Sequence, residues 1–174
     1  MCVCIGDLGN AVFGSPEERP PSRTSAKDVG IEAVTLYYRA PEILLGMAAF
    51  SYPVDMWALG CTAAEMLLRT PLFRGDSQVD MLRLTFELFG KPPGGTLVRL
   101  PSFSSHSPSF APQPWPPERL RSADWPPRFA DFVRAALEMD PLRRISAADA
   151  GKHDFFQLQR FRVECAECPT GRGR

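Results

Sequence analysis

The stretch Thr35-Leu36-Tyr37-Tyr38-Arg39-Ala40-Pro41-Glu42-Ile43-Leu44-Leu45-Gly46 is the part of this 174-residue chain that decides its fold. Pro41 suits the first turn of a short helix, because its ring fixes φ and it lacks the N–H that a helix start leaves unpaired. We expect that helix to run to Leu45 and to stop at Gly46. Upstream, Gly6-Asp7-Leu8-Gly9 is a second compact motif, and the residues between the two are rich in Ser, Pro, Gly and charge, which predicts a loop.

The composition is that of one globular domain. Hydrophobic residues make up 44% of the chain, and 20 basic and 20 acidic side chains balance one another. Balanced charge gives no overall field that would attract nucleic acid or an anionic membrane. The apolar stretches are interrupted well short of a membrane span, and no basic-then-apolar signal segment opens the chain. We therefore expect an intracellular protein, cytoplasmic or nuclear, with neither nucleic acid nor membrane among its partners.

The five cysteines do not form a recognisable metal or redox site. Cys165 and Cys168 have the spacing of a C-x-x-C pair, but a zinc site needs two further ligands. His106 and His153 are the only histidines available for that purpose. We favour reduced intracellular thiols over a metal or redox role.

The most apolar segment predicts a buried helix. Pro53 suits the first turn of a helix that runs to about Arg69. Apolar side chains cover nearly every face of this helix, which is typical of a helix buried on all sides. They are Val54, Met56, Trp57, Ala58, Leu59, Cys61, Ala63, Ala64, Met66, Leu67 and Leu68. We expect this helix to be the central pillar of the domain.

Three further helices are predicted downstream. The first begins near Ser77, which stands at capping-box spacing from Asp80, and ends at Gly90. The second starts after Pro126-Pro127, where apolar residues fit the helical period. A short third helix follows Ser146.

Four blocks of sequence, in order across roughly residues 3–156, resemble protein kinases. They are Gly6-Asp7-Leu8-Gly9, similar to the metal-binding Asp-Phe-Gly turn; Tyr38-Arg39-Ala40-Pro41-Glu42, similar to the Ala-Pro-Glu anchor; Tyr52-Pro53-Val54-Asp55-Met56-Trp57-Ala58-Leu59-Gly60-Cys61, similar to D-x-W-x-x-G; and Asp140-Pro141-Leu142-Arg143-Arg144-Ile145-Ser146-Ala147 with His153-Asp154-Phe155-Phe156. The resemblance implies a mainly α fold, a partial kinase-like C-lobe without the N-lobe and the catalytic loop.

The resemblance narrows to the cyclin-dependent group, which includes MAP and related kinases. Residues 34–46 and Pro71-Leu72-Phe73-Arg74-Gly75-Asp76-Ser77 both look like that group. Residues 92–127 hold 10 of the 18 prolines and show no period, which predicts a long Pro/Ser loop where the group carries an insert. The resemblance implies a serine/threonine kinase that uses ATP and Mg²⁺ and acts on protein substrates. It leaves open whether a cyclin-like regulatory subunit binds.

The resemblance also assigns roles to residues near the nucleotide and the substrate. Asp7 would hold the Mg²⁺ that bridges the nucleotide phosphates, because a hard cation prefers an oxygen anion. Thr35 and Arg39 would belong to the substrate-docking loop. Asp55 would brace the catalytic loop through backbone amides of that loop.

A second set of residues would anchor the activation segment. Ala40, Pro41 and Glu42 form the Ala-Pro-Glu triplet, and Glu42 would pair with Arg144 in a buried ion pair. Removing one partner of such a pair strands a buried charge, at a cost of about 3–5 kcal/mol. We therefore expect these four residues to tie the activation segment to the last helices.

The activation segment departs from the cyclin-dependent pattern at one position. The group carries an activating phosphothreonine five residues before the threonine that matches Thr35, and this position is Gly30 here. Thr24 and Ser25 are the nearest candidate phosphorylation sites. The alternative is that both are ordinary solvated hydroxyls of a loop.

These assignments divide the chain into six consecutive segments. They are a remnant strand with the metal-binding turn (1–7), the activation segment (8–42), the central C-lobe helices (43–91), the Pro/Ser-rich insert loop (92–127), the final C-lobe helices (128–158) and a polar tail (159–174).

Parts that kinase chemistry needs are missing from this sequence. It contains no His-Arg-Asp, and the six residues before Asp7 leave no room for a Gly-rich loop or a phosphate-binding lysine. Our leading interpretation is therefore the C-terminal part of a kinase, not catalytically competent as this chain alone. A natural short form that binds substrates or partners without catalysis is the alternative, and a misfolded fragment is a third.

The missing parts also bear on stability. In the family, the pillar helix packs against a helix that precedes the catalytic loop. We therefore expect Met56, Trp57, Ala64 or Leu67 to face water, at about 1.5–3 kcal/mol for each large side chain. The isolated chain would then be marginally stable, aggregation-prone or dependent on a partner.

Overall fold

The computed structural model describes residues 11, 35–47, 52–90, 92, 94–100, 102–103 and 125–157. Every regular element in these residues is helical, which confirms the mainly α class. In chain order the elements are the 3₁₀ helix η3 (Leu36–Tyr38), α1 (Pro41–Leu44), α2 (Pro53–Leu68), α3 (Gln78–Phe89), the 3₁₀ helix η4 (Leu97–Arg99), α6 (Pro127–Ala136), α7 (Ala147–Ala150) and α8 (Asp154–Gln157). None of these helices is long and apolar enough to span a lipid bilayer.

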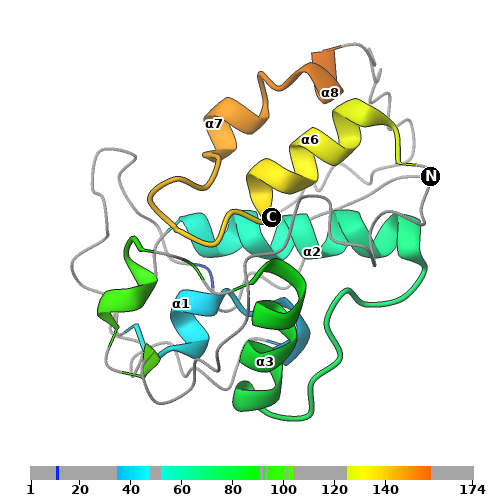
Figure 1. Cartoon of the computed structure of the whole chain (residues 1–174). Helices are drawn as coiled ribbons and strands as arrows, with labels where there is room; N and C mark the ends of the chain where they lie inside the picture. The colour runs from blue at the N-terminus through cyan, green and yellow to red at the C-terminus, as the bar shows by residue number, and fades with distance from the viewer. Residues whose placement is uncertain are drawn as a thin grey trace, which may run out of the picture.

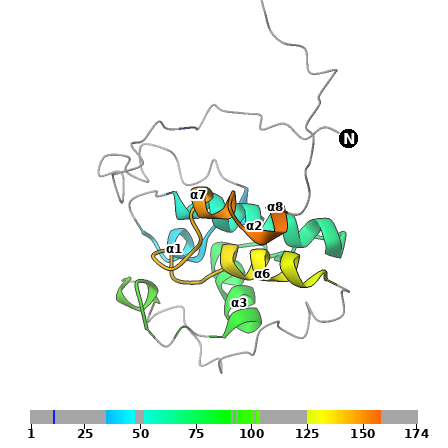
Figure 2. The ribbon, with the colours of Figure 1, turned by 90° about the horizontal axis from the view of Figure 1, so that it is seen from above.

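Helix α2 is the central element of the described fold. It runs across the middle of the molecule, with α6, α7 and α8 on one side and α1 and α3 on the other (Figure 1). Seen from above, α7 and α8 lie over α2 (Figure 2). Helix α2 packs against α6, and α1 packs against α3. As predicted, α2 begins at Pro53; it ends at Leu68, and Arg69 follows as a left-handed cap with φ of 59°.

Gly60 allows α2 and α6 to approach each other closely. A Cβ atom at this position would lie 2.8 Å from Cδ2 of Leu137 and 3.0 Å from Cβ of Ala136. Ala136 is the last residue of α6 and Leu137 caps that helix. The glycine of the D-x-W-x-x-G motif is therefore explained by the packing of two helices, independently of any catalytic role.

The expectation that α2 is buried on all sides is wrong. Leu59, Met66 and Leu67 are 44%, 64% and 42% exposed. Leu59 and Met66 are two helical turns apart and so share one face of α2. Apolar composition predicts burial only where a neighbouring element covers the helix, and in the described structure these side chains lack full cover.

Of the four residues expected to face water, Leu67 is exposed as predicted, but the prediction is wrong for Met56, Trp57 and Ala64, which are buried. The Trp57 ring stacks on Phe73 with ring centroids 6.1 Å apart and meets Phe89 edge-on at 6.0 Å. Phe73 lies between α2 and α3, and Phe89 ends α3. This side of α2 is thus covered by elements that follow it in the chain, and the reason for expecting marginal stability does not apply to these three residues.

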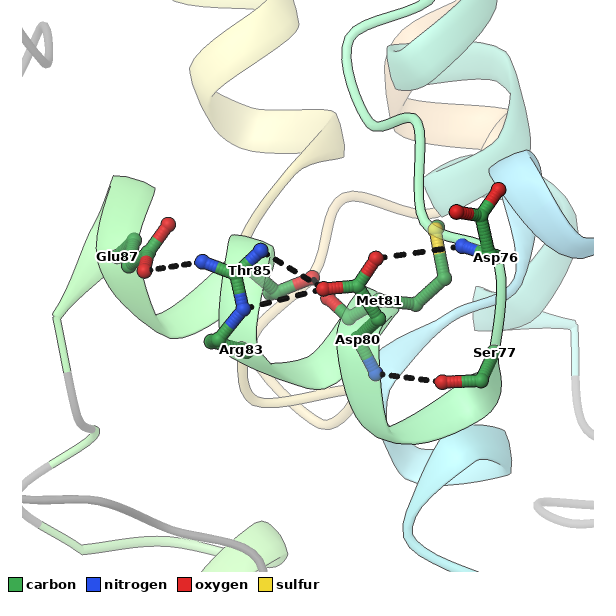
Figure 3. A network of polar contacts seen from close by, with 7 residues as sticks. All are labelled: Asp76, Ser77, Asp80, Met81, Arg83, Thr85 and Glu87. Atoms are coloured by element: carbon green, nitrogen blue, oxygen red, sulfur yellow. Dashed lines mark hydrogen bonds and ion pairs between the residues drawn. The ribbon is translucent and has the colours of Figure 1, made fainter.

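Helix α3 begins with the predicted cap. The hydroxyl of Ser77 accepts a hydrogen bond from the N–H of Asp80 at 3.1 Å. The Asp80 carboxylate in turn accepts from the N–H of Asp76 at 3.2 Å and from Nε of Arg83 at 3.0 Å. Arg83 also pairs with Glu87 one turn further along (Figure 3). Capping and side-chain pairs of this kind stabilise the start of a surface helix.

The other helix limits agree with the sequence to within one residue. Helix α3 ends before Gly90, whose φ is 76°, and α6 begins at Pro127, one residue before the predicted start after Pro126-Pro127. The hydroxyl of Ser146 caps α7 by accepting from the N–H of Asp149 at 3.1 Å. Helix α1, which we expected to reach Leu45, ends one residue earlier.

Most of the predicted Pro/Ser loop at 92–127 lies outside the described residues. Its described part contains η4, which the sequence did not predict. Leu97 of η4 is buried in the core, and the N–H of Thr96 donates to the Asp140 carboxylate at 3.3 Å. The start of this loop is therefore docked on the segment that follows α6.

Candidate functional site

The centre of the site is a buried ion pair between α1 and the loop that precedes α7. Glu42 lies in the first turn of α1, and Arg144 lies 102 residues further along the chain. Nη1 of Arg144 donates to Oε1 of Glu42 at 2.7 Å, and Nη2 donates to Oε2 at 3.0 Å. Both side chains are fully shielded from solvent. Two parallel bonds between charged groups fix direction as well as distance.

Arg144 satisfies its remaining donors on backbone carbonyls. Nε donates to the carbonyl of Glu138 at 2.9 Å, Nη1 also donates to that of Pro53 at 2.8 Å, and Nη2 to that of Met139 at 3.4 Å. With the bonds to Glu42, every N–H of the guanidinium has an acceptor. The guanidinium carbon also lies 5.1 Å from the centre of the Trp57 ring. This one side chain therefore joins α1, the start of α2 and the segment that follows α6.

Ala40 and Pro41 set the direction of Glu42. Both are buried, and Pro41 is the first residue of α1. The carbonyl of Ala40 accepts from the N–H groups of Ile43 and Leu44 at 3.0 and 3.1 Å. The short helix thus starts at the proline as the sequence predicts, and its first turn presents Glu42 inward. The structure brings together all four residues that the sequence assigned to the anchor.

The loop before this anchor is built around η3. Thr35 is exposed and precedes η3, while Arg39 follows it and is buried. The N–H of Tyr38 donates to the carbonyl of Thr35 at 3.3 Å, and that of Arg39 to the carbonyl of Leu36 at 3.2 Å. Thr35 and Arg39 therefore lie at the two ends of one turn, directly upstream of the Ala-Pro-Glu triplet.

A polar contact that the sequence did not predict joins this loop to α2. The hydroxyl of Tyr38 donates to Oε2 of Glu65 at 2.8 Å. The hydrogen bond, together with partial burial, raises the pKa of the Tyr38 hydroxyl. The two residues are 27 positions apart, so no local pattern connects them. The available signal is that Glu65 is a carboxylate within an otherwise apolar run of α2.

Asp55 lies in the first turn of α2, where its N–H donates to the carbonyl of Tyr52 at 3.2 Å. The residue as a whole is exposed, yet neighbouring protein atoms desolvate the carboxyl and raise its pKa. Within the described part of the chain, no hydrogen-bond donor reaches this carboxylate. The brace that the resemblance assigns to Asp55 remains an expectation.

Asp7, Thr24 and Ser25 all lie outside the described residues. Among the residues that the structure does describe, no group of three His, Cys, Asp or Glu side chains is arranged to hold a metal ion. The described site therefore consists of the buried Glu42–Arg144 anchor and the η3 turn directly upstream of it.

Comparison with known protein families agrees with this geometry. The family described as protein kinase domain matches residues 3–156. The match covers the anchor, the loop before it, α2 and the helices that follow.

Proposed function

Since the chain belongs to the protein kinase domain family, we propose that it is the C-terminal part of a cyclin-dependent-kinase-like serine/threonine kinase. The complete protein would transfer the γ-phosphoryl group of ATP to a serine or threonine hydroxyl of a protein substrate. The subgroup is supported by the sequence from Val34 to Gly46 and by Pro71-Leu72-Phe73-Arg74-Gly75-Asp76-Ser77. The proposal leaves open whether a cyclin-like regulatory subunit binds.

The observation that carries the proposal is the buried pair of Glu42 and Arg144. It fixes the end of the Ala-Pro-Glu segment against the start of α2 and the segment that follows α6, so that the loop holding Thr35 and Arg39 has a defined place. A kinase needs such a loop to present the target hydroxyl, because its catalysis depends on positioning and electrostatics more than on covalent chemistry.

ATP with Mg²⁺ is the cofactor pair that this function requires. Mg²⁺ neutralises charge that develops on the phosphates during transfer. In this sequence Asp7 is the residue proposed to hold the ion, as a carboxylate directly after a glycine. The other nucleotide contacts of a kinase come from a Gly-rich loop, a phosphate-binding lysine and a catalytic loop. None of these three motifs is found in these 174 residues.

We further propose that this chain alone does not transfer phosphate. The purified 174-residue chain, incubated with radiolabelled ATP, Mg²⁺ and a general protein substrate, should show no more incorporation than a protein-free blank. A native messenger RNA that extends the reading frame upstream should encode the missing loops, and the longer protein should be active. In that protein Asp7→Ala should abolish transfer, whereas Glu87→Ala on the surface of α3 should not. Transfer by the short chain that Asp7→Ala abolishes would refute the proposal.

A second candidate is a non-catalytic short form that binds substrates. It is supported by two contacts, the buried ion pair of the anchor and the bond from Tyr38 to Glu65. Both form among the described residues without a helix or strand upstream of η3. Added to the active longer protein, the short chain should then inhibit competitively with respect to protein substrate and not with respect to ATP. Absence of inhibition at a large molar excess would exclude this second function.

A further inference from the structure

His153 lies directly before α8 and caps this helix with a ring that can take up a proton. We propose that His153 is a pH-sensitive cap, which holds α8 against α6 when its ring is neutral and releases α8 when the ring is protonated. The inference goes beyond the proposed kinase function and does not depend on it, because it rests on contacts within the 174-residue chain.

The backbone and the ring of His153 together satisfy the start of α8. The carbonyl of His153 accepts from the N–H groups of Phe156 at 2.8 Å and Gln157 at 3.3 Å. Nδ1 of its ring accepts from the N–H of Phe155 at 3.2 Å. A helix start leaves four N–H groups without a partner inside the helix, and these bonds satisfy three of them. A helix of only four residues is unstable by itself, so α8 depends on this cap and on its packing.

The bond from Phe155 requires a neutral ring at position 153. Nδ1 accepts through its lone pair, so the single proton of the neutral ring is on Nε2. A second proton, added to Nδ1, turns the acceptor into a donor that points at the N–H of Phe155. The positive ring also repels the N–H groups at the start of the helix. Histidine is the side chain that changes its charge between pH of about 5 and 8, so the cap is lost in mild acid.

Release of α8 would uncover an aromatic cluster on α6. The ring of His153 meets Phe132 edge-on with centroids 5.8 Å apart. Phe155 stacks on Phe132 at 6.0 Å, and Phe156 meets it edge-on at 5.1 Å. Phe155 also lies 5.1 Å from Phe129. Helix α8 packs against α6 (Figure 1), and Phe132 is only 2% exposed. The capped helix thus covers Phe132, and a released helix would leave this ring open to solvent.

The charged groups around His153 do not compensate for a positive ring. On the adjoining elements they are Arg128, Asp131 and Arg134 of α6, Asp149 of α7, and Lys152 and Asp154 beside His153 in the chain. Among the described residues, none of these groups forms a hydrogen bond or an ion pair with the ring, and the Asp149 carboxylate accepts from the Ser146 hydroxyl at 2.6 Å. A protonated His153 therefore loses its bond to Phe155 and gains no carboxylate partner from them.

Amide hydrogen exchange of the 174-residue chain tests the cap, with the peptide that covers residues 151–157 followed at pH of about 7.5 and about 5.5. Each rate is divided by that of the same peptide unfolded at the same pH. The wild type should lose about 3- to 10-fold of its protection at the lower pH, in line with one hydrogen bond. His153→Asn is the matched control, because asparagine caps without titrating, and its protection should not change. His153→Ala should be poorly protected at both pH values.

An NMR spectrum of the ring nitrogens gives a second readout. It is recorded with His106→Gln, so that His153 is the only histidine in the chain. At neutral pH the proton should be on Nε2. A neutral ring with its proton on Nδ1 would overturn the proposal, as would wild-type protection that stays the same at both pH values. An equal loss of protection in His153→Asn would also overturn it, because that loss would belong to another group.

Discussion

Arg144 holds Glu42 through two parallel hydrogen bonds, 2.7 and 3.0 Å long, at a point where neither side chain touches solvent. The pair closes a span of 102 residues and leaves no guanidinium donor free. The attraction between two buried charges offsets the free-energy cost of their desolvation only when the geometry is good and every remaining donor has an acceptor. Both conditions hold here, so the pair is formed at a low net cost but is sensitive to the loss of either partner.

Glu42→Ala should therefore destabilise the chain strongly. It leaves the Arg144 guanidinium buried without its counter-charge, and the expected loss of unfolding free energy is about 3–5 kcal/mol. Urea unfolding followed by tryptophan fluorescence would measure the loss. Glu87→Ala is the matched control, because Glu87 pairs with Arg83 on the exposed surface of α3; its urea midpoint should not move measurably. Equal effects of the two changes would contradict the account given for the buried pair.

Gly60→Ala tests the close contact between α2 and α6. The added Cβ would lie within 2.8–3.0 Å of Leu137 and Ala136 atoms, and overpacking of this kind costs about 1–3 kcal/mol. The same substitution also stabilises the helix by about 1 kcal/mol, because alanine favours a helix more than glycine does. We expect a net loss of stability in thermal or urea unfolding.

Gly94→Ala is the comparison for that change, since nothing lies within 4 Å of a Cβ at Gly94. Its stability should stay the same or rise by up to about 1 kcal/mol. If Gly60→Ala is the more stable of the two variants, α6 does not pack on α2 as closely as described.

Met56 and Met66 provide a matched pair on one helix. Met56 is 5% exposed and Met66 is 64% exposed. Met56→Ala should cost about 2–5 kcal/mol, because it opens a cavity in the core, whereas Met66→Ala should stay within about 0.5 kcal/mol of the parent. Urea unfolding of both variants, measured side by side, tests this difference in stability. The opposite order would restore the expectation from the sequence that Met56 faces water.

The helix limits could be predicted because their signals are local. Proline at position 53 and at 127 begins a helix, serine at 77 and at 146 caps one, and glycine at 90 stops one. Each of these residues acts through its own backbone or through a neighbour within one turn. Predictions of this kind do not depend on where the rest of the chain lies.

Burial and long-range contacts could not be predicted in the same way. The sequence shows that α2 is apolar, but which face is covered depends on residues such as Phe73 and Phe89, whose position only the tertiary fold determines. The resemblance supplied the pairing of Glu42 with Arg144, whereas nothing in it or in local spacing pointed to Tyr38 and Glu65. Contacts across 27 or 102 residues carry no periodic signal.

The bond between Tyr38 and Glu65 also predicts a pH dependence. A folded-state pKa raised above the ordinary value of 10.0 means that the neutral hydroxyl is the form stabilised by folding. Its contribution is complete below the unfolded pKa and is lost as the pH rises through the raised folded pKa. Tyr38→Phe should therefore be less stable than the parent at pH 8, and the difference should shrink above pH of about 10.

The test is to follow urea unfolding of both proteins from pH 8 to 11, and to repeat it in the Glu65→Gln background. The negative charge of Glu65 contributes to the raised pKa of Tyr38. In the Gln background the difference between Tyr and Phe at position 38 should therefore be smaller at pH 8 and should fade at a lower pH. A difference that stays constant across this range, or that grows with pH, would show that the Tyr38 hydroxyl does not donate to Glu65.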